Sequence, residues 1–308
     1  MANKLSSKIP FKEEMQFEYG VPRELVPGVR RLVANNGGPF TFKGTNTYLI
    51  GHKDIAVVDP GPDDPEHLEA ILSASEGGEI AHIIVTHTHM DHTEGLDALR
   101  DATGAQTYGA HTPDAPRGTP TYSPTESDFV DRAFIPDIIL EDGDLIKTDE
   151  WTLRAIHTPG HAPDHICLAA LDQNILLSGD HVMAWNTSIV APPEGNMNDY
   201  MTSLEKLLEH EHELFLPAHG GTIERPRRVV RAYLVHRQMR EGAILEAIRT
   251  GHNTIPNISE KVYSGIDAAY VNAAKLSVFA HVERLYASGH ISCEEPFSQH
   301  ASFFPREL

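Results

Sequence analysis

The densest group of metal-binding side chains in the sequence occupies six consecutive residues, 87–92, which read HTHMDH. At the histidine and aspartate contents of this chain, an H-x-H-x-D-H pattern arises by chance only about 0.004 times, so the pattern is specific. In an extended segment residues two apart point the same way, so His87 and His89 can bind one cation, whereas Asp91 and His92 turn toward a neighbouring position. The spacing predicts two adjacent metal ions rather than one.

Three further candidate ligands follow apolar runs later in the chain. His161 comes after a Thr-Pro-Gly turn, Asp180 after Leu-Ser-Gly and His219 after Leu-Pro-Ala. Each of them alone could equally well cap or hydrogen-bond local backbone, but together they complete a ligand set for a pair of cations. Two more histidines stand beside these motifs. We expect His165 to be a surface histidine, and for His181 the pattern leaves a hydrogen bond to a ligand and a surface position equally open.

The candidate ligands need a scaffold, and the first 220 residues alternate β-rich runs with helical patterns. Mixed elements of this kind indicate sheets covered by helices. Several predicted strands end in a polar cluster, and residues just past strand ends are where such folds gather ligands and catalysts. The predicted strands are 47–50, 55–59, 82–86, 151–156, 166–170, 175–178 and 214–216, and the predicted helices are 65–75, 93–103 and 198–210.

These motifs resemble those of the metallo-β-lactamase superfamily, in the chain order of that family. The resemblance covers residues 50–220 through HTHMDH, Thr-Pro-Gly-His, Ser-Gly-Asp and Pro-Ala-His-Gly, and the segments 44–51 and 57–61 resemble its opening strands. It implies an α+β fold, an αββα sandwich with the metals at one edge of the two sheets. Carried over position by position, the resemblance gives one metal to His87, His89 and His161, the second to Asp91, His92 and His219, and Asp180 to both as a bridge.

Imidazole and carboxylate ligands lead us to expect two divalent ions, zinc first, with iron or manganese as alternatives. Two such ions can share and ionise a water at neutral pH, and Asp91 is our candidate for accepting and returning a proton. The predicted activity is a dinuclear metal-dependent hydrolase, in which a metal-bound hydroxide attacks an ester, thioester or lactone of a small metabolite. The alternatives are a metal-dependent endoribonuclease acting on single-stranded RNA and a non-enzymatic winged-helix regulator.

Charge and length divide the chain. Residues 1–220 hold 14 basic and 35 acidic side chains, whereas residues 221–308 hold 11 and 9. We therefore predict a catalytic domain at 1–224 and a linker helix with a winged-helix-like domain at 225–308. The strong negative charge of the first part disfavours a nucleic-acid substrate and favours a small molecule.

The C-terminal part resembles the winged-helix tail of the β-lactamase-like-protein-2 group, a group that includes a single-stranded-RNA endoribonuclease. Its predicted elements are a helix at 225–240, a helix at 268–288 and a short strand at 290–293. The first helix carries six arginines, which we interpret as a solvated face paired with the acidic sandwich. With Lys261, Lys275 and Arg284 they could instead form a basic stripe for nucleic acid.

The remaining composition is that of an ordinary folded protein: 308 residues, a net charge of −19 and 40% apolar residues. The first residues show no apolar export signal and no run is long enough to span a membrane, so we expect a cytoplasmic protein. Two cysteines, Cys167 and Cys293, exclude a disulfide framework and a cysteine-rich zinc site. We predict a long surface loop at residues 111–127. For the assembly, we consider a homo-oligomer.

Overall fold

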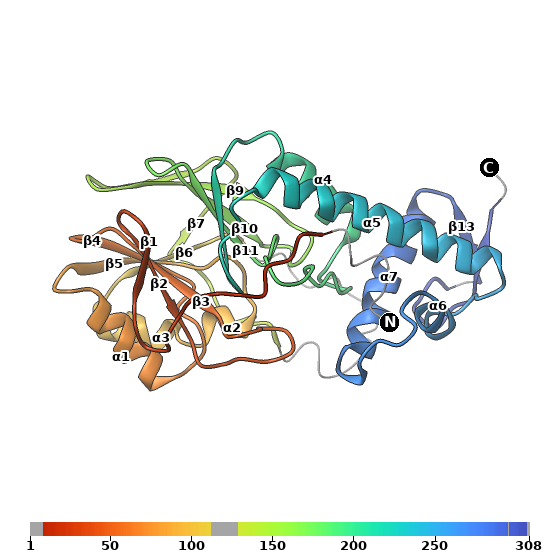
Figure 1. The fold of residues 1–308 in the computed structure, drawn as a ribbon, viewed down its shortest axis with the longest axis horizontal. Helices are drawn as coiled ribbons and strands as arrows, with labels where there is room; N and C mark the ends of the chain where they lie inside the picture. The colour runs from red at the N-terminus through yellow and green to blue at the C-terminus, as the bar shows by residue number, and fades with distance from the viewer. Residues whose placement is uncertain (1–8, 112–128, 295, 307–308) are drawn as a thin grey trace.

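The computed structural model describes residues 9–111, 129–294 and 296–306. The loop predicted at 111–127 lies, apart from His111, outside the described residues. The described part forms a sandwich of two sheets with helices on its outer faces, joined by one long helix to a C-terminal group of helices (Figure 1).

The first sheet has seven strands in sequential order, antiparallel from β1 to β4 and parallel from β4 to β7. The second has five strands in the order β12-β11-β10-β9-β8, all antiparallel except the parallel pair β11 and β12. The strands of the first sheet are β1 (Arg23–Val26), β2 (Val29–Val33), β3 (Asn46–Ile50), β4 (Asp54–Val58), β5 (Glu79–Ile84), β6 (Gln106–Gly109) and β7 (Ile138–Ile139). Those of the second are β8 (Leu145–Lys147), β9 (Thr152–His157), β10 (Ile166–Ala170), β11 (Ile175–Gly179) and β12 (Leu214–Pro217).

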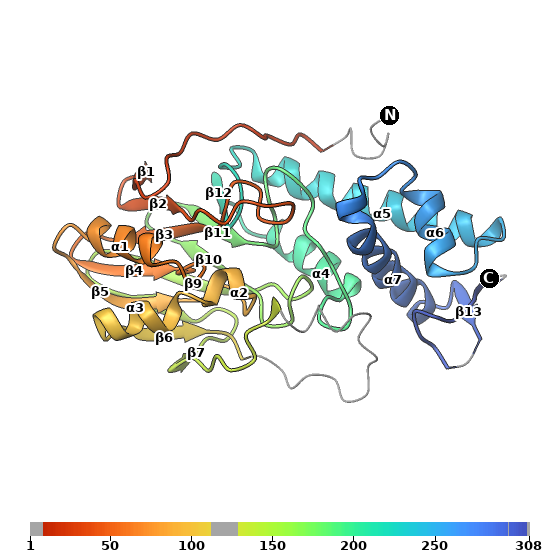
Figure 2. The same ribbon diagram turned by 90° about the horizontal axis from the view of Figure 1, so that it is seen from below.

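Strand alternation explains the four layers. Tyr48 and Ile50 of β3 point into the core between the sheets, whereas Leu49 points to the outer face, as period-two geometry requires. On that outer face α1 (Pro65–Ala74) and α3 (Leu96–Thr103) bury Ile71 and Leu99 against the first sheet. Figure 2 shows both helices on the same side of this sheet.

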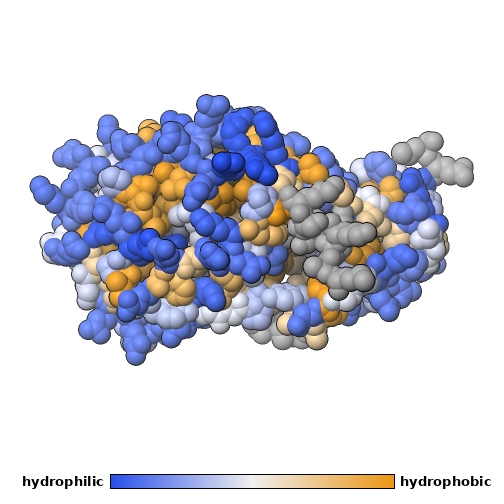
Figure 3. Space-filling model, viewed as in Figure 1, coloured by the Kyte–Doolittle hydropathy of each residue, from blue (hydrophilic) through white to orange (hydrophobic). Residues whose placement is uncertain are grey.

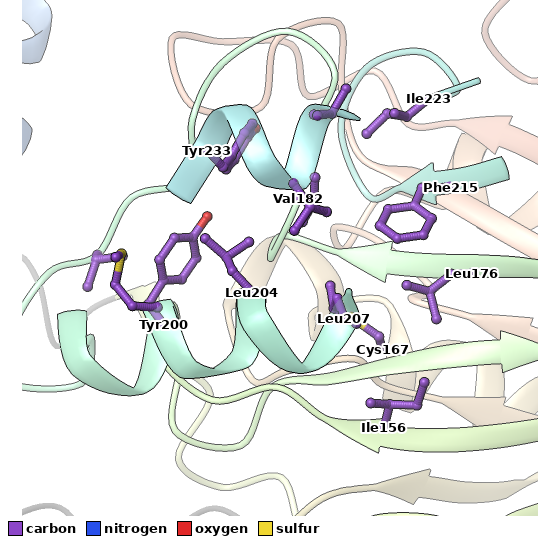
Figure 4. Close-up of a cluster of buried hydrophobic side chains, with 14 of the residues drawn as sticks. Ile156, Cys167, Leu176, Val182, Tyr200, Leu204, Leu207, Phe215, Ile223 and Tyr233 are labelled. Atoms are coloured by element: carbon purple, nitrogen blue, oxygen red, sulfur yellow. The ribbon is translucent and has the colours of Figure 1, made fainter. Parts of the chain in front are cut away.

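The outer face of the second sheet is covered by α4 (Met197–Leu207) and the first half of α5 (Pro226–Arg249). Tyr200 and Leu204 of α4 and Tyr233 of α5 pack over Leu176 and Phe215 of the sheet (Figure 4). Fully burying each such side chain stabilises the fold by roughly 1.5–3 kcal/mol. The result is the αββα order that the resemblance of the motifs implies.

A separate core closes the C-terminal part. It joins the second half of α5, through Ile244 and Ile248, to α6 (Ile255–Val262), α7 (Val271–Ala287) and the antiparallel pair β13 (Ile291–Cys293) and β14 (Phe303–Pro305). A short 3-10 turn, η3 (Ala268–Tyr270), precedes α7. Helix α5 therefore belongs to both cores and fixes one part against the other.

Several predicted boundaries were wrong for identifiable reasons. The helix predicted at 93–103 is broken at Gly95 into α2 (Met90–Thr93) and α3, because Gly95 packs closely on another segment: its N–H donates to the Gly61 carbonyl at 2.9 Å. The helix predicted at 225–240 continues to Arg249, because its second half packs in the core of the C-terminal part. The weak strands β1, β2, β6, β7, β8 and β14 and helix α6 were not predicted.

The interpretation of the six arginines at 225–240 as a solvated face was wrong for two of them, both in α5. Arg237 and Arg240 are buried, each with 3% of its surface exposed, whereas Arg228 and Arg231 are exposed. The exposed face does reach the acidic part, where an Arg227 nitrogen lies 3.9 Å from a Glu211 oxygen.

Figure 3 shows a mostly hydrophilic face, with apolar residues gathered in a band along the middle of the sandwich portion. Among the described residues, the helices fall short of the length and apolarity that crossing a membrane requires.

Candidate metal centre

The seven predicted ligands converge at one edge of the sandwich. Residues 87–92 follow β5, and His161, Asp180 and His219 follow β9, β11 and β12. Three groups of side chains each bring three ligand atoms within 4.8 Å of one another: His87 with His89 and His161, His87 with His92 and Asp180, and Asp91 with His92 and His219. The structure thus brings together all seven side chains that the sequence singled out.

In the first group three imidazole nitrogens converge. His89 Nδ1 lies 2.9 Å from His87 Nε2 and 3.0 Å from His161 Nε2. The outer nitrogen of His161, Nδ1, contacts the Ile189 carbonyl oxygen at 2.6 Å, and a carbonyl only accepts, so this nitrogen carries the proton. The inner Nε2 of His161 therefore presents a lone pair to the centre of the group.

The outer nitrogen of His87 is fixed in the same way. The Thr86 hydroxyl donates its proton to Asp59 Oδ2 at 2.8 Å, so at 3.0 Å from His87 Nδ1 it can only accept. The inner Nε2 of His87 consequently also presents a lone pair. The lone pairs of His87 and His161 both face His89 Nδ1. They repel each other unless a proton or a cation lies between them.

The second group combines imidazole with carboxylate. His92 donates from Nδ1 to Asp59 Oδ2 at 3.0 Å, and His219 Nδ1 faces the Gly44 carbonyl at 3.3 Å. Their inner Nε2 atoms lie 3.4 Å and 3.2 Å from Asp91 Oδ2. These four contacts orient both rings with Nε2 toward the carboxylate.

Asp180 lies between the two groups. Its Oδ2 is 3.6 Å from His161 Nε2 and 3.9 Å from His92 Nε2, and its Oδ1 is 3.4 Å from His219 Nε2. Asp180 Oδ1 and His92 Nε2 are buried without a hydrogen-bond partner among the described residues. A buried carboxylate with an unsatisfied oxygen is costly unless something else binds it.

The pKa values of the histidines in the cluster shift in two opposite directions. Burial, reinforced by neighbouring histidines, lowers the pKa of His87 well below its ordinary range and that of His89 to about 3. Burial also opposes charge on His92, but nearby carboxylates, Asp91 first, outweigh it and raise the pKa of His92 to about 9. Likewise burial opposes ionisation of Asp91, yet the imidazoles of His92 and His219 prevail and lower its pKa. The ionised Asp91 therefore lies beside a protonated His92, whereas His87 and His89 are neutral.

This donor set fits divalent cations. Convergent imidazole lone pairs and ionised carboxylates are the ligands that zinc and related transition metals take, and a protonated ring would have to lose its proton on binding. The orphaned Asp180 Oδ1 and His92 Nε2 are atoms that such a cation would satisfy. The residues present can hold one ion in each group with Asp180 contacting both.

Sequence reasoning missed the residues that hold the ligands in place. Asp59 is 2% exposed and accepts hydrogen bonds from the Thr86 backbone and hydroxyl as well as from His92. The Thr45 hydroxyl donates to Asp91 Oδ2 at 3.1 Å. The only local signal for Asp59 was its place at the end of a predicted strand.

The surface position expected for His165 was wrong. It is fully buried, its Nδ1 lies 2.9 Å from the Thr158 hydroxyl, and its Nε2 accepts the Asp180 backbone N–H at 3.1 Å. His181 is also fully buried, against the Tyr200 ring at a centroid distance of 4.6 Å. His165 therefore fixes the backbone that carries Asp180.

Two glycines of the motifs are required by close approach. Gly160, directly before His161, has φ +131°, and a Cβ there would meet the Tyr200 backbone at 2.3 Å. Gly179, directly before Asp180, has φ +50°, and a Cβ there would meet His165 Nε2 at 2.5 Å. The turns that present both ligands therefore depend on the missing side chain.

The cluster opens into a cavity of about 940 Å³. His89, Asp91, His161, Asp180 and His219 lie in its wall. Much of the remaining lining is apolar and comes from both parts of the chain, including Phe11, Phe40, Phe129, Trp185, Ile266 and Leu276. This size and lining are those of a site for a small molecule.

The C-terminal part closes one side of the cavity. The rings of Phe40, from the sandwich, and Tyr270, from η3, meet edge to face at a centroid distance of 6.0 Å. Residues of α5 and α7 complete this wall.

Comparison with known proteins agrees with the geometry. A family profile of the metallo-beta-lactamase superfamily matches residues 40–219, which is more than half of the chain. The chain therefore belongs to the metallo-beta-lactamase superfamily, and by class it is a metal-dependent hydrolase.

Individual relatives span most of the chain. It is 31% identical over 273 residues to the beta-lactamase-like protein 2 homolog of Caenorhabditis elegans, covering 86% of each chain. It is 28% identical over 278 residues to an atrochrysone carboxyl ACP thioesterase of Aspergillus novofumigatus, covering 89% of this chain and 77% of that one. The crystal structure of a beta-lactamase domain protein from Burkholderia ambifaria has the same fold, with a TM-score of 0.80, 21% identity and 99% of each chain covered.

Proposed function

We propose that this protein hydrolyses an ester, thioester or lactone of a small metabolite, using two divalent cations, zinc first among the candidates. The observation that carries the proposal is the convergence of seven imidazole and carboxylate side chains, five of which lie in the wall of a largely apolar cavity. The name of the thioesterase relative supports a thioester as the first substrate class to test.

The proposed ligand assignment follows the two groups. His87, His89 and His161 would hold one cation, Asp91, His92 and His219 the other, and Asp180 would contact both. When bound, the cations supply Lewis acidity, which polarises a carbonyl oxygen and lowers the pKa of a water toward ~7.

Asp91 is the proposed proton carrier. Its side chain is 30% exposed toward the cavity, whereas that of His92 is fully buried, and the Thr45 hydroxyl fixes Asp91 Oδ2 by donating to it at 3.1 Å. Asp91 accepts a proton as water attacks the carbonyl carbon and returns it to the departing alcohol or thiol. The apolar walls exclude other water from the acyl group.

The domain arrangement is part of the proposal. Residues 1–224 form the catalytic domain, and 225–308 form a linker helix and a winged-helix-like domain that serves as one wall of the cavity. Two separate cores support this division; α5 contributes to both, and Ala280 of α7 also packs in the first.

The test combines metal analysis with a substrate panel. Protein purified without chelator should contain up to two equivalents of zinc, iron or manganese and hydrolyse aryl esters, thioesters or lactones. His89→Ala should lose both metal and activity, and His52→Ala, which changes an exposed histidine far from the cluster, should lose neither. A metal-free protein inert on every ester would refute the proposal.

The panel should include bis(4-nitrophenyl) phosphate and single-stranded RNA. Cleavage of RNA that weakens steeply with salt, without ester hydrolysis, would favour the endoribonuclease alternative.

A further inference from the structure

Two arginines of α5 lie inside the cavity rather than on the surface. Arg237 and Arg240 are each 3% exposed, and both line the same cavity as His89, Asp91 and Asp180. They sit on the buried stripe of the helix, in register with Tyr233 and Ile244. The proposed catalytic groups thus share their pocket with two buried positive charges.

Neither guanidinium is neutralised. In the described part of the chain no carboxylate oxygen lies within 4.0 Å of Arg237 or Arg240. Glu241, the next residue along, is engaged elsewhere: it accepts two hydrogen bonds from Arg284, at 2.6 and 2.8 Å. A third pocket arginine, Arg132, differs because it is paired with Glu194.

The contacts that Arg237 and Arg240 do make are neutral. The Arg237 guanidinium lies 5.0 Å from the centroid of the Tyr200 ring and donates to the Ser188 carbonyl. The Arg240 guanidinium lies 3.9 Å from the centroid of the Tyr263 ring and donates to a single carbonyl of α6, at 3.2 Å. Stacking holds a guanidinium by its face and leaves its N–H edges free, and in both residues the buried Nε has no partner.

Among the residues that the structure describes, their surroundings add no compensating charge. Neighbouring His236 also lines the cavity, but burial, helped by Arg237 and Arg240, lowers its pKa to about 3, so it is neutral. Burial, with a smaller contribution from Arg237, also lowers the pKa of Arg240, although an arginine stays charged at neutral pH. Uncompensated buried charge is costly, and in a chain of net charge −19 acidic partners were abundant.

We propose that Arg237 and Arg240 form a subsite for an anionic group of the substrate, a carboxylate or a phosphate, at the end remote from the bond that is hydrolysed. This inference rests on the proposed function and narrows its substrate class to acyl compounds with an apolar body and an anionic terminus. Guanidinium N–H edges match both oxyanions, and the apolar residues that line the same cavity suit the body of such a molecule.

Matched substrates test the selectivity. The 4-nitrophenyl monoesters of C6 to C10 dicarboxylic acids should be compared with 4-nitrophenyl alkanoates of the same lengths. At one or two chain lengths, kcat/KM should be about 10- to 100-fold higher for the acid, which is the value of one hydrogen bond to a charged group. In Arg240→Gln the preference for the acid should disappear, because KM for the acid rises. Arg240→Lys should keep part of the preference. Arg228→Gln, on the exposed face of the same helix, should leave it unchanged.

Binding to chelator-treated protein gives a readout independent of catalysis. Calorimetric titrations with hexanoate, hexyl phosphate and hexanamide should show binding of an anion but not of the amide, and the tighter anion identifies carboxylate or phosphate. Arg240→Gln should abolish that binding, while thermal unfolding verifies that the variant is folded.

The outcomes separate this inference from the proposed function. If no ester is hydrolysed, the proposed function fails, and anion binding alone then decides on the arginines. If neutral and anionic esters react equally and neither anion binds, the subsite is refuted while the hydrolase stands. Arg240-dependent cleavage of RNA without hexanoate or hexyl phosphate binding would also overturn it, because the arginines would then serve a polymer.

Discussion

Asp59→Asn tests whether the centre depends on residues outside the ligand set. Asp59 Oδ1 accepts the Thr86 N–H at 2.8 Å, and Oδ2 accepts the Thr86 hydroxyl at 2.8 Å and His92 Nδ1 at 3.0 Å. An asparagine can keep the first bond, but its NH₂ group would then face two donors. His92 relieves this clash by giving up its Nδ1 proton, which leaves its remaining proton on Nε2, the atom that faces the cluster.

The expected cost follows from that tautomer change. Removing the residue that orients a metal-binding histidine weakens metal affinity by about 10- to 100-fold, or about 1.4–2.7 kcal/mol. The chelated protein should also unfold more easily, by about 1.5–3 kcal/mol, because a charge-assisted hydrogen bond is lost. Zinc affinity is measured by competition with a chromophoric chelator, and stability by denaturation in the presence of excess chelator.

Asp137→Asn is the matched control. Asp137 also accepts the N–H and hydroxyl of one threonine, Thr107, both at 3.0 Å on Oδ2, and an Arg100 N–H at 2.9 Å on Oδ1, but it does not belong to the cluster. It should lose stability and keep zinc affinity. Equal zinc affinity in Asp59→Asn, Asp137→Asn and the unmodified protein would refute the assignment of Asp59 as the residue that positions His92.

Three other changes have definite expected results. His89→Ala should lower activity at least 100-fold and reduce bound metal by elemental analysis; full metal content would contradict its place in the first group. Gly160→Ala should destabilise the fold by several kcal/mol in denaturant titration, since a Cβ would meet the Tyr200 backbone at 2.3 Å; wild-type stability would show that the turn can relax. Burial raises the pKa of Glu283 from 4.5 to about 7, so the folded state binds the proton more tightly and stability falls as pH rises from 4.5 to 7. Glu283→Gln should therefore be more stable by about 1 kcal/mol at pH 8, allowing for partial exposure, with no gain at pH 4; a gain at both values would exclude this titration.

The ligand set was accessible from the sequence because its spacing is local. His87, His89, Asp91 and His92 lie within six residues, and alternation in an extended segment already divides them between two positions. His161, Asp180 and His219 were found because each follows an apolar run, and strand ends meet at one edge of a sheet. The αββα layers followed from the resemblance of these motifs to a known family.

The residues that support the ligands were not accessible in this way. Asp59 orients His92 only because β4 and β5 pair in parallel. His165 precedes β10 and Asp180 follows β11, so they meet only because these two strands pair in the second sheet. Their distances depend on strand pairing, which spacing along the chain does not specify.

The burial of two α5 arginines was likewise not predicted from the sequence. Their helical spacing was visible, and Arg237 and Arg240 fall on the stripe that continues through Tyr233 and Ile244, which is a signal for burial. A charge run taken alone indicated solvent instead, because charged side chains are rarely buried without partners. The sequence determined which side chains can do chemistry and in which order they occur, since both depend on short-range pattern. Only the tertiary structure decided that one long helix shared by two cores turns two of its charges into the cavity, because burial depends on what packs against the helix.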